Sequence, residues 1–262
     1  MRWQTDRNRA ELGCDPELAF VHNPERQQAD LATRLRAAFA VLEERVHAGH
    51  LSSYGVATWS SFQEKAFTVQ QLDRLAAEAA GGDHHLRAIQ LPVSLVMDQH
   101  AAEALRGTGP IAAAAELGWD VHASAPLHGG ELPRLATPEI AELIRSGATV
   151  AAACLTAVAS CPGVSKVLLA TGNPAHWIDA LAATRAEVPR DTLRSTAECR
   201  ACQREPCRAR RRPAVGRSGH VRQPRHDATL LGGGPYLTQA DTVSGGARDD
   251  GVPNYVLTRG AW

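Results

Sequence analysis

The stretch LAFVHNPE at residues 18–25 is a short apolar run that stops on His22 and passes into an Asn-Pro turn. A run of this length bounded by turn residues is typical of a buried β-strand. Residues 29–48 then repeat apolar side chains at helical spacing, and Gly49 follows as a suitable helix C-terminus. Together the two segments predict one βα unit.

Four more units of this kind follow along the chain. Alternation of short apolar runs with amphipathic helices indicates a parallel sheet, so we expect an α/β fold of about five βα units over residues 1–190. From about residue 191 to 262 the sequence is rich in Arg, Pro and Gly, which predicts a disordered tail. The further strands are expected at 53–58, 88–91, 120–125 and 167–170, and the further helices at 68–80, at 111–117, from about 137, and at 174–183.

The overall composition excludes several classes of protein. Lys plus Arg equals Asp plus Glu at 28 each, so no net charge favours binding to nucleic acid or anionic membrane. The N-terminus is charged and the best apolar run, residues 148–159, is shorter than the roughly 20 residues needed to span a bilayer. We therefore expect a cytoplasmic protein with reduced cysteines and no membrane partner.

Polar residues terminate each of the expected strands. The carboxyl ends of parallel strands meet at one edge, where the loops of βα folds gather their ligand-binding groups. Apolar runs that end in polar side chains are what a ligand site needs there. The residues concerned are His22-Asn23, Thr58-Trp59, Gln90, Ser124 and Thr171-Gly172-Asn173.

Five of these segments resemble, in order, the later strands of the aldo-keto reductases. FVHNPE at 20–25 resembles the strand that carries the family's histidine, and YGVATW at 54–59 and IQLP at 89–92 resemble the strands that hold the nicotinamide carboxamide. ASAPL at 123–127 is similar to the strand whose aromatic residue stacks on the nicotinamide, and LLATGNPAHW at 168–177 to the segment that binds the adenosine phosphate. The resemblance covers about residues 10–188.

The resemblance implies a fold, a reaction and a set of site residues. The fold would be a partial TIM-type (β/α) barrel, N-terminally truncated, and the reaction NAD(P)H-dependent interconversion of a small-molecule carbonyl and an alcohol, with NADP or alternatively NAD as cofactor. His22 would be catalytic, since a neutral imidazole can donate a hydrogen bond to a carbonyl oxygen as charge develops on it. The cofactor-binding residues would be Thr58, Gln90, Ser124, Gly172, Asn173 and His176.

The absence of part of the family's catalytic set favours an alternative, a catalytically inactive remnant or a binding protein. The family's Asp, Tyr and Lys precede the histidine, yet residues 1–21 contain no Tyr and no Lys, and Tyr54 is expected at the opposite rim. Ser124 also replaces the usual aromatic residue, and Thr58 the usual Asn. Five strands predict an open, curved sheet instead of a closed barrel, with open edges that allow self-association.

Three motifs lie outside this reading of the chain. His84-His85 fits either a metal site or a solvated loop, and we favour the loop. Cys199, Cys202 and Cys207, completed by His220 or His226, have the spacing of a zinc site, and the arginines around them could contact phosphates. Since neither a second C-x-x-C nor interleaved aromatic residues accompany them, we expect no metal and no nucleic-acid partner.

Overall fold

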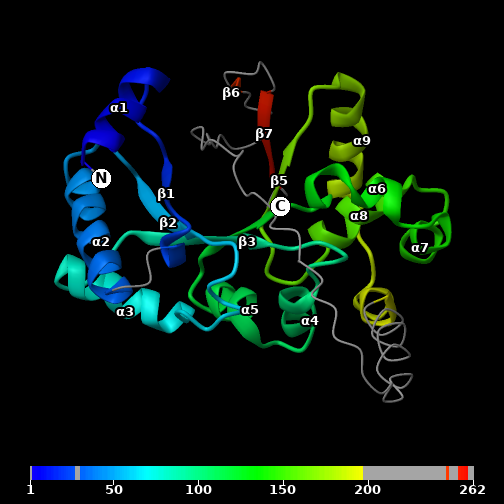
Figure 1. Cartoon of the computed structure of the whole chain (residues 1–262), viewed down its shortest axis with the longest axis horizontal. Helices are drawn as coiled ribbons and strands as arrows, with labels where there is room; N and C mark the ends of the chain where they lie inside the picture. The colour runs from blue at the N-terminus through cyan, green and yellow to red at the C-terminus, as the bar shows by residue number, and fades with distance from the viewer. Residues whose placement is uncertain (1, 27–29, 197–245, 248–252, 259–262) are drawn as a thin grey trace, which may run out of the picture.

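The five apolar runs form five adjacent parallel strands, as the sequence predicts (Figure 1). The computed structural model describes residues 2–26, 30–196, 246–247 and 253–258. The sheet order is β1-β2-β3-β4-β5-β7-β6, in which the last two strands are antiparallel to their neighbours. The strands are β1 (Leu18–His22), β2 (Ser53–Ala57), β3 (Leu86–Pro92), β4 (Asp120–Ser124), β5 (Lys166–Ala170), β6 (Gly246–Ala247) and β7 (Pro253–Thr258).

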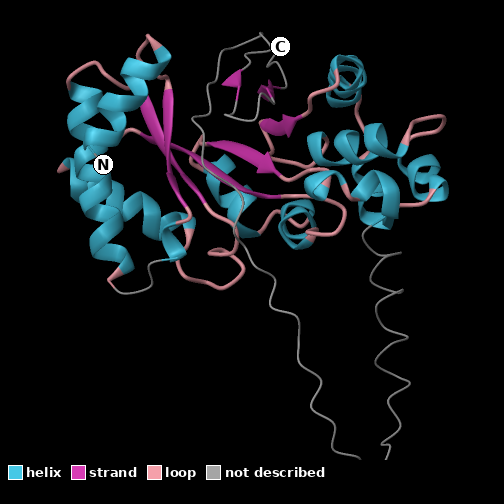
Figure 2. Cartoon of the chain, turned by 45° about the horizontal axis from the view of Figure 1, so that its top comes forward, coloured by secondary structure: helices cyan, strands magenta, loops and turns pink. Residues whose placement is uncertain are grey.

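Helices follow the parallel strands and lie along the outside of the sheet (Figure 2). Thr68 caps α3 through a capping box with Gln71, and Gly81 ends that helix at a φ of 75°. The helices are α1 (Arg2–Leu12), α2 (Leu31–His47), α3 (Val69–Ala80), α4 (Gln99–Leu105), α5 (Gly109–Glu116), α6 (Leu132–Leu135), α7 (Pro138–Ile144), α8 (Val150–Ala159) and α9 (Pro174–Arg185), with 3₁₀ turns η1 (Pro24–Arg26) and η2 (His128–Gly130).

The parallel sheet is strongly curved, and a single ring crosses its concave face. Phe20 of β1 lies edge-on to His122 of β4 with ring centroids 5.2 Å apart, although two strands separate β1 from β4. Gly55 of β2 makes the crossing possible, since a Cβ there would lie 2.5 Å from Cε1 of Phe20 and 2.7 Å from the Ala88 carbonyl oxygen. The sheet order does not close on itself, which confirms an open, curved sheet.

The convex face of β2 packs against α2 around a buried carboxylate. Glu43 of α2 is 3% exposed and accepts hydrogen bonds from the Tyr54 hydroxyl at 2.8 Å and the His85 backbone N–H at 2.7 Å. Its second oxygen lies 2.7 Å from Nδ1 of His85. Burial acts to raise the pKa of Glu43, but the hydrogen bonds from His85 and Tyr54 outweigh it and hold the pKa below its ordinary value. The network therefore joins α2, β2 and the start of β3.

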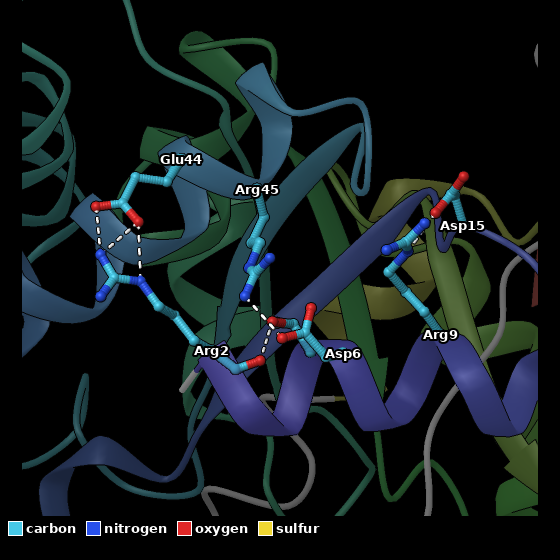
Figure 3. A network of polar contacts seen from close by, with 7 residues as sticks. Arg2, Asp6, Arg9, Asp15, Glu44 and Arg45 are labelled. Atoms are coloured by element: carbon cyan, nitrogen blue, oxygen red, sulfur yellow. Dashed lines mark hydrogen bonds and ion pairs between the residues drawn. The ribbon is translucent and has the colours of Figure 1, made fainter.

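Ion pairs, not apolar contacts, hold α1 against α2 (Figure 3). α1 has no buried residue. Arg2 forms a bidentate pair with Glu44, with Nε–Oε2 at 2.9 Å and Nη2–Oε1 at 2.6 Å, and Arg45 reaches Asp6 at 2.8 Å. Arg9 pairs with Asp15 at the approach to β1. Exposed pairs of this kind contribute little stability and weaken with salt.

Packing continues a few residues past the boundary expected near residue 190. Residues 190–196 are helical, and Leu193 is buried in a small second cluster with Leu105 and Ile144. Within the segment expected to be disordered, the structure describes β6 and β7, and the rest of that tail lies outside the described residues. The division into 1–190 and 191–262 and self-association through open edges stay predictions. No helix in the described ranges is long and apolar enough to cross a membrane.

Candidate functional site

The structure places the expected site residues at one edge of the sheet. His22 lies opposite Ala57 in the register of β1 and β2, and Ala57 lies opposite Gln90 of β3. Ser124 ends β4 opposite Pro92, and β5 leads into the turn at 171–173. Because the five strands are parallel, these residues occupy the carboxyl ends of neighbouring strands. This arrangement is consistent with a single ligand site at this edge of the sheet, which we call the mouth. The role of each residue there stays a prediction.

His22 and Gln90 differ in their surroundings. The His22 side chain is exposed, while local burial and the charge of Arg26 lower its pKa despite the opposing charge of Glu25, so it is neutral at pH 7. Gln90 is 8% exposed, and its side-chain amide forms no hydrogen bond with another residue in the described part of the chain. A free donor and a free acceptor therefore remain at Gln90 for a ligand.

Thr58 is engaged within its own turn. Its hydroxyl donates to Oγ of Ser61 at 2.6 Å and accepts from the Ser61 backbone N–H at 3.0 Å, while its backbone N–H continues the ladder to the Gln90 carbonyl at 2.9 Å. Thr58 is also buried, at 4% exposure. The hydroxyl that was expected to hold the nicotinamide therefore stabilises the β2–α3 turn.

The carboxylate of Glu25 lies beside the same turn and was not singled out from the sequence. Its Oε1 accepts hydrogen bonds from the backbone N–H groups of Trp59, at 3.0 Å, and Ser60, at 3.4 Å. Burial raises the pKa of Glu25, but its own backbone N–H and that of Trp59 hold the pKa below its ordinary value. The signal in the sequence is a carboxylate three residues after the strand-end histidine.

Ser124 is half-buried and is followed by a loop with unusual backbone angles. Its carbonyl accepts from the Val93 N–H at 3.0 Å. Ala125 and His128 then adopt positive φ values of 51° and 49°. Such angles in residues other than glycine cost free energy and turn the chain away sharply after the strand.

The turn before α9 carries Gly172, Asn173 and His176, all exposed. The Asn173 side chain accepts from the Ala175 N–H at 3.0 Å and so caps the helix, and its amide nitrogen lies 3.1 Å from Nε2 of His176. Nδ1 of His176 lies 3.0 Å from Oγ1 of Thr171. Gly172 faces open space. The helix N-terminus is thus capped by its own residues, and an incoming phosphate would displace that cap.

Tyr54, the tyrosine whose side chain the structure describes, does not serve the mouth as a general acid. Tyr54 faces α2 and is bound to Glu43, and burial together with that carboxylate raises its pKa. Lys166 forms an ion pair of 2.9 Å with Asp120 at the amino ends of β5 and β4, the rim opposite His22. The expectation that Tyr54 lies away from the mouth agrees with its hydrogen bond to Glu43.

The two adjacent histidines lie half-buried in the loop before β3, where the sequence predicts a loop. His84 lies 3.0 Å from the Asp73 carboxylate of α3, and His85 binds Glu43 of α2, so each is tied to a different helix. The loop is less solvated than expected, because it passes between two helices that each present a carboxylate. The described ranges contain no group of three or more side chains suited to a metal ion. Cys199, Cys202, Cys207, His220 and His226 lie outside the described residues.

Comparison with known proteins identifies the fold. The chain has an aldo-keto reductase-like fold, similar to that of a thermostable aldo-keto reductase solved with the inhibitor epalrestat, with 17% identity, a TM-score of 0.54, and coverage of 74% of this chain and 64% of that one. No family model and no curated sequence matches the chain.

Two further solved structures agree with this assignment. One is a glycerol dehydrogenase from Gluconobacter oxydans, with 16% identity, a TM-score of 0.58, and coverage of 84% of this chain and 67% of that one. The other is an aldo-keto reductase from Bacillus halodurans in its holo form, with 15% identity, a TM-score of 0.55, and coverage of 74% and 63%. The chain spans about two thirds of the length of these structures.

Proposed function

We propose that this chain is an oxidoreductase of the aldo-keto reductase type that uses NADPH, or alternatively NADH, to reduce a small carbonyl compound. One observation carries the proposal. Consecutive parallel strands of an aldo-keto reductase-like fold end in polar residues at one edge, and the first of them ends in a neutral histidine. A cytoplasmic location and a small-molecule substrate remain predictions.

The described residues fit the nicotinamide end of an NAD(P)H cofactor better than its phosphate end. The free side-chain amide of Gln90 suits a carboxamide, because it can donate to the carbonyl and accept from the N–H. The turn at Gly172 is open, but Asn173 already occupies an N–H group of α9. Gln90 would therefore hold the nicotinamide end, and the turn with His176 would hold the phosphate end after the cap is displaced.

His22 supplies the electrostatic part of the reaction. A bound nicotinamide cofactor would supply a hydride to the carbonyl carbon, negative charge would develop on the oxygen, and the proton that completes the alcohol would come from solvent water. A neutral His22 donates a hydrogen bond to that oxygen from its N–H. Because Thr58 is held by Ser61, its part is to fix the turn beside His22.

A second candidate, nucleotide binding without turnover, is favoured by the missing acid. Tyr54 is committed to Glu43, and the described strand-end residues of the proposed site, His22, Thr58, Gln90 and Ser124, include no other tyrosine or lysine. General acid catalysis is worth roughly 10²- to 10⁴-fold. Its absence would leave the binding residues intact while reducing turnover.

The His22→Ala variant of the full chain is expected to reduce kcat for NADPH oxidation with a panel of aldehydes by about 10²-fold, as loss of one donor to a developing oxyanion does. Calorimetry should give an unchanged Kd for NADPH, because His22 acts on the carbonyl. Gln90→Ala is the contrasting variant and should instead raise the Kd. Binding of NADPH by the unaltered chain without any turnover would support the second candidate, and absence of nucleotide binding would reject both.

A further inference from the structure

Trp59 is an exposed indole at the carboxyl edge of the sheet. Its exposure is 49%, and it follows β2 by two residues, beside the strand ends that carry His22 and Gln90. Trp59 lies in the bend that follows β2, two residues past Ala57, which is paired with both His22 and Gln90. An aromatic face is therefore presented next to the proposed site.

A buried carboxylate fixes the backbone of this tryptophan. Glu25 is 8% exposed, and its Oε1 accepts the N–H groups of Trp59 and Ser60. Its Oε2 is buried and has no hydrogen-bond partner among the described residues. Burial acts to raise the pKa of Glu25, but the hydrogen bonds around it hold that pKa below the ordinary value, so the folded chain keeps the carboxylate charged. A charged side chain bound to two backbone N–H groups thus fixes the turn that carries Trp59.

Apart from Trp59 and the imidazoles of His22 and His176, the described strand-end residues of the proposed site carry no aromatic ring. Ser124 ends β4 where an aromatic side chain would offer a flat face, and the Thr58 hydroxyl is bound within its turn. Trp59 is an exposed large apolar side chain in the turn that follows β2 at this edge. The other tryptophans with described side chains lie elsewhere: Trp3 on α1, Trp119 before β4, and Trp177 on α9.

We propose that Trp59 is a binding residue whose indole stacks on a planar aromatic ring of the ligand, and that Glu25 is the positioning residue that holds it there. The inference rests on the proposed function for the location of that ring. Two sources share this chemistry, the nicotinamide ring of the cofactor and an aromatic ring of the carbonyl substrate. Stacking of a ring on an aromatic side chain changes binding by amounts that correspond to about tenfold or more in Kd.

The test follows the indole N–H resonance of Trp59 in the full chain, assigned by its absence in Trp59→Phe. NADPH, adenosine 2′,5′-bisphosphate and benzaldehyde are added in separate titrations. A response to NADPH but not to the bisphosphate identifies the nicotinamide ring, and a response to benzaldehyde identifies the substrate ring. Trp59→Ala should raise the Kd of the responding ligand about tenfold. Trp3→Ala, at the still more exposed tryptophan of α1 (68% against 49%), is the control and should leave the Kd unchanged.

The role of Glu25 is tested with two variants. Glu25→Ala should raise the Kd of the ligand that responds to Trp59→Ala, and it should shift the Trp59 resonance before ligand is added. Glu25→Gln keeps an acceptor oxygen and should therefore retain most of the affinity. If Glu25→Ala loses stability but leaves the Trp59 resonance and the Kd unchanged, Glu25 is a structural residue only, and its proposed positioning role is wrong. If neither NADPH nor benzaldehyde moves the Trp59 resonance, the stacking inference is wrong. A response to benzaldehyde without NADPH binding would support stacking and reject the proposed cofactor.

Discussion

Gly55→Ala is expected to lower the free energy of unfolding by about 3 kcal/mol, at the upper end of the range for overpacked cores. The new Cβ would lie 2.5 Å from Cε1 of Phe20 and 2.7 Å from the Ala88 carbonyl oxygen. The ring could move, but the carbonyl belongs to the adjacent strand β3, so relief requires β2 and β3 to separate. Urea denaturation followed by circular dichroism measures the change.

Two comparisons identify the cause of this loss. Gly172→Ala introduces the same methyl group into open space and should be close to neutral. In Gly55→Ala combined with Phe20→Ala, the clash with the ring is gone, so the combined loss should be smaller than the sum of the two single losses. Strict additivity would mean that Phe20 and Gly55 do not share one packing constraint, and the account of the curved sheet would fail.

Glu43→Ala is expected to destabilise the fold by about 3 kcal/mol at pH 7, because it leaves buried donors of Tyr54 and His85 without their acceptor. The sign of the pH dependence follows from the lowered pKa. Stabilisation by the Glu43 carboxylate is complete above its ordinary value of 4.5 and is lost as pH falls through the lower pKa of the folded state. The difference in free energy of unfolding between the unaltered chain and Glu43→Ala should therefore become smaller below about pH 4.

The neighbouring carboxylate offers a matched control for that experiment. Glu44→Ala removes an exposed ion pair with Arg2 and should change stability far less. Tyr54→Phe removes one donor and should account for only part of the Glu43→Ala loss. A Glu43 variant as stable as the Glu44 variant across this pH range would show that the buried network does not stabilise the junction of α2, β2 and β3.

The sequence predicts the parallel sheet well because its signals are local. Turn residues and strand-length apolar runs place β1 to β5 within two residues of their observed ends, and Thr68 and Gly81 mark the ends of α3. α1 was missed because it has no apolar face, and its contacts to Glu44 and Arg45 lie about 40 residues away in the chain. α8 was noted only as an apolar run, since a helix buried on nearly every side shows no amphipathic period.

The candidate site could be placed from the sequence but its hydrogen bonds could not. Strand alternation and chain order are enough to bring His22, Gln90 and Ser124 to one edge. Whether a side chain is free depends on tertiary contacts: Thr58 is taken by Ser61, and Asn173 caps α9. The role of Glu25 could not be predicted from the sequence for the same reason, because its partners are backbone groups 34 and 35 residues away.

The ring of Phe20 spans β2 and reaches β4, so the bend of the sheet is set by residues that all lie within one arc of four strands. In a closed barrel the side chains of opposite walls fill the interior and keep each other apart. Here Phe20, seated over Gly55, packs against His122 within the arc of β1 to β4. The described contacts that bend the sheet therefore lie within this arc, and packing between β1 and β4 sets the angles at which its strand ends converge.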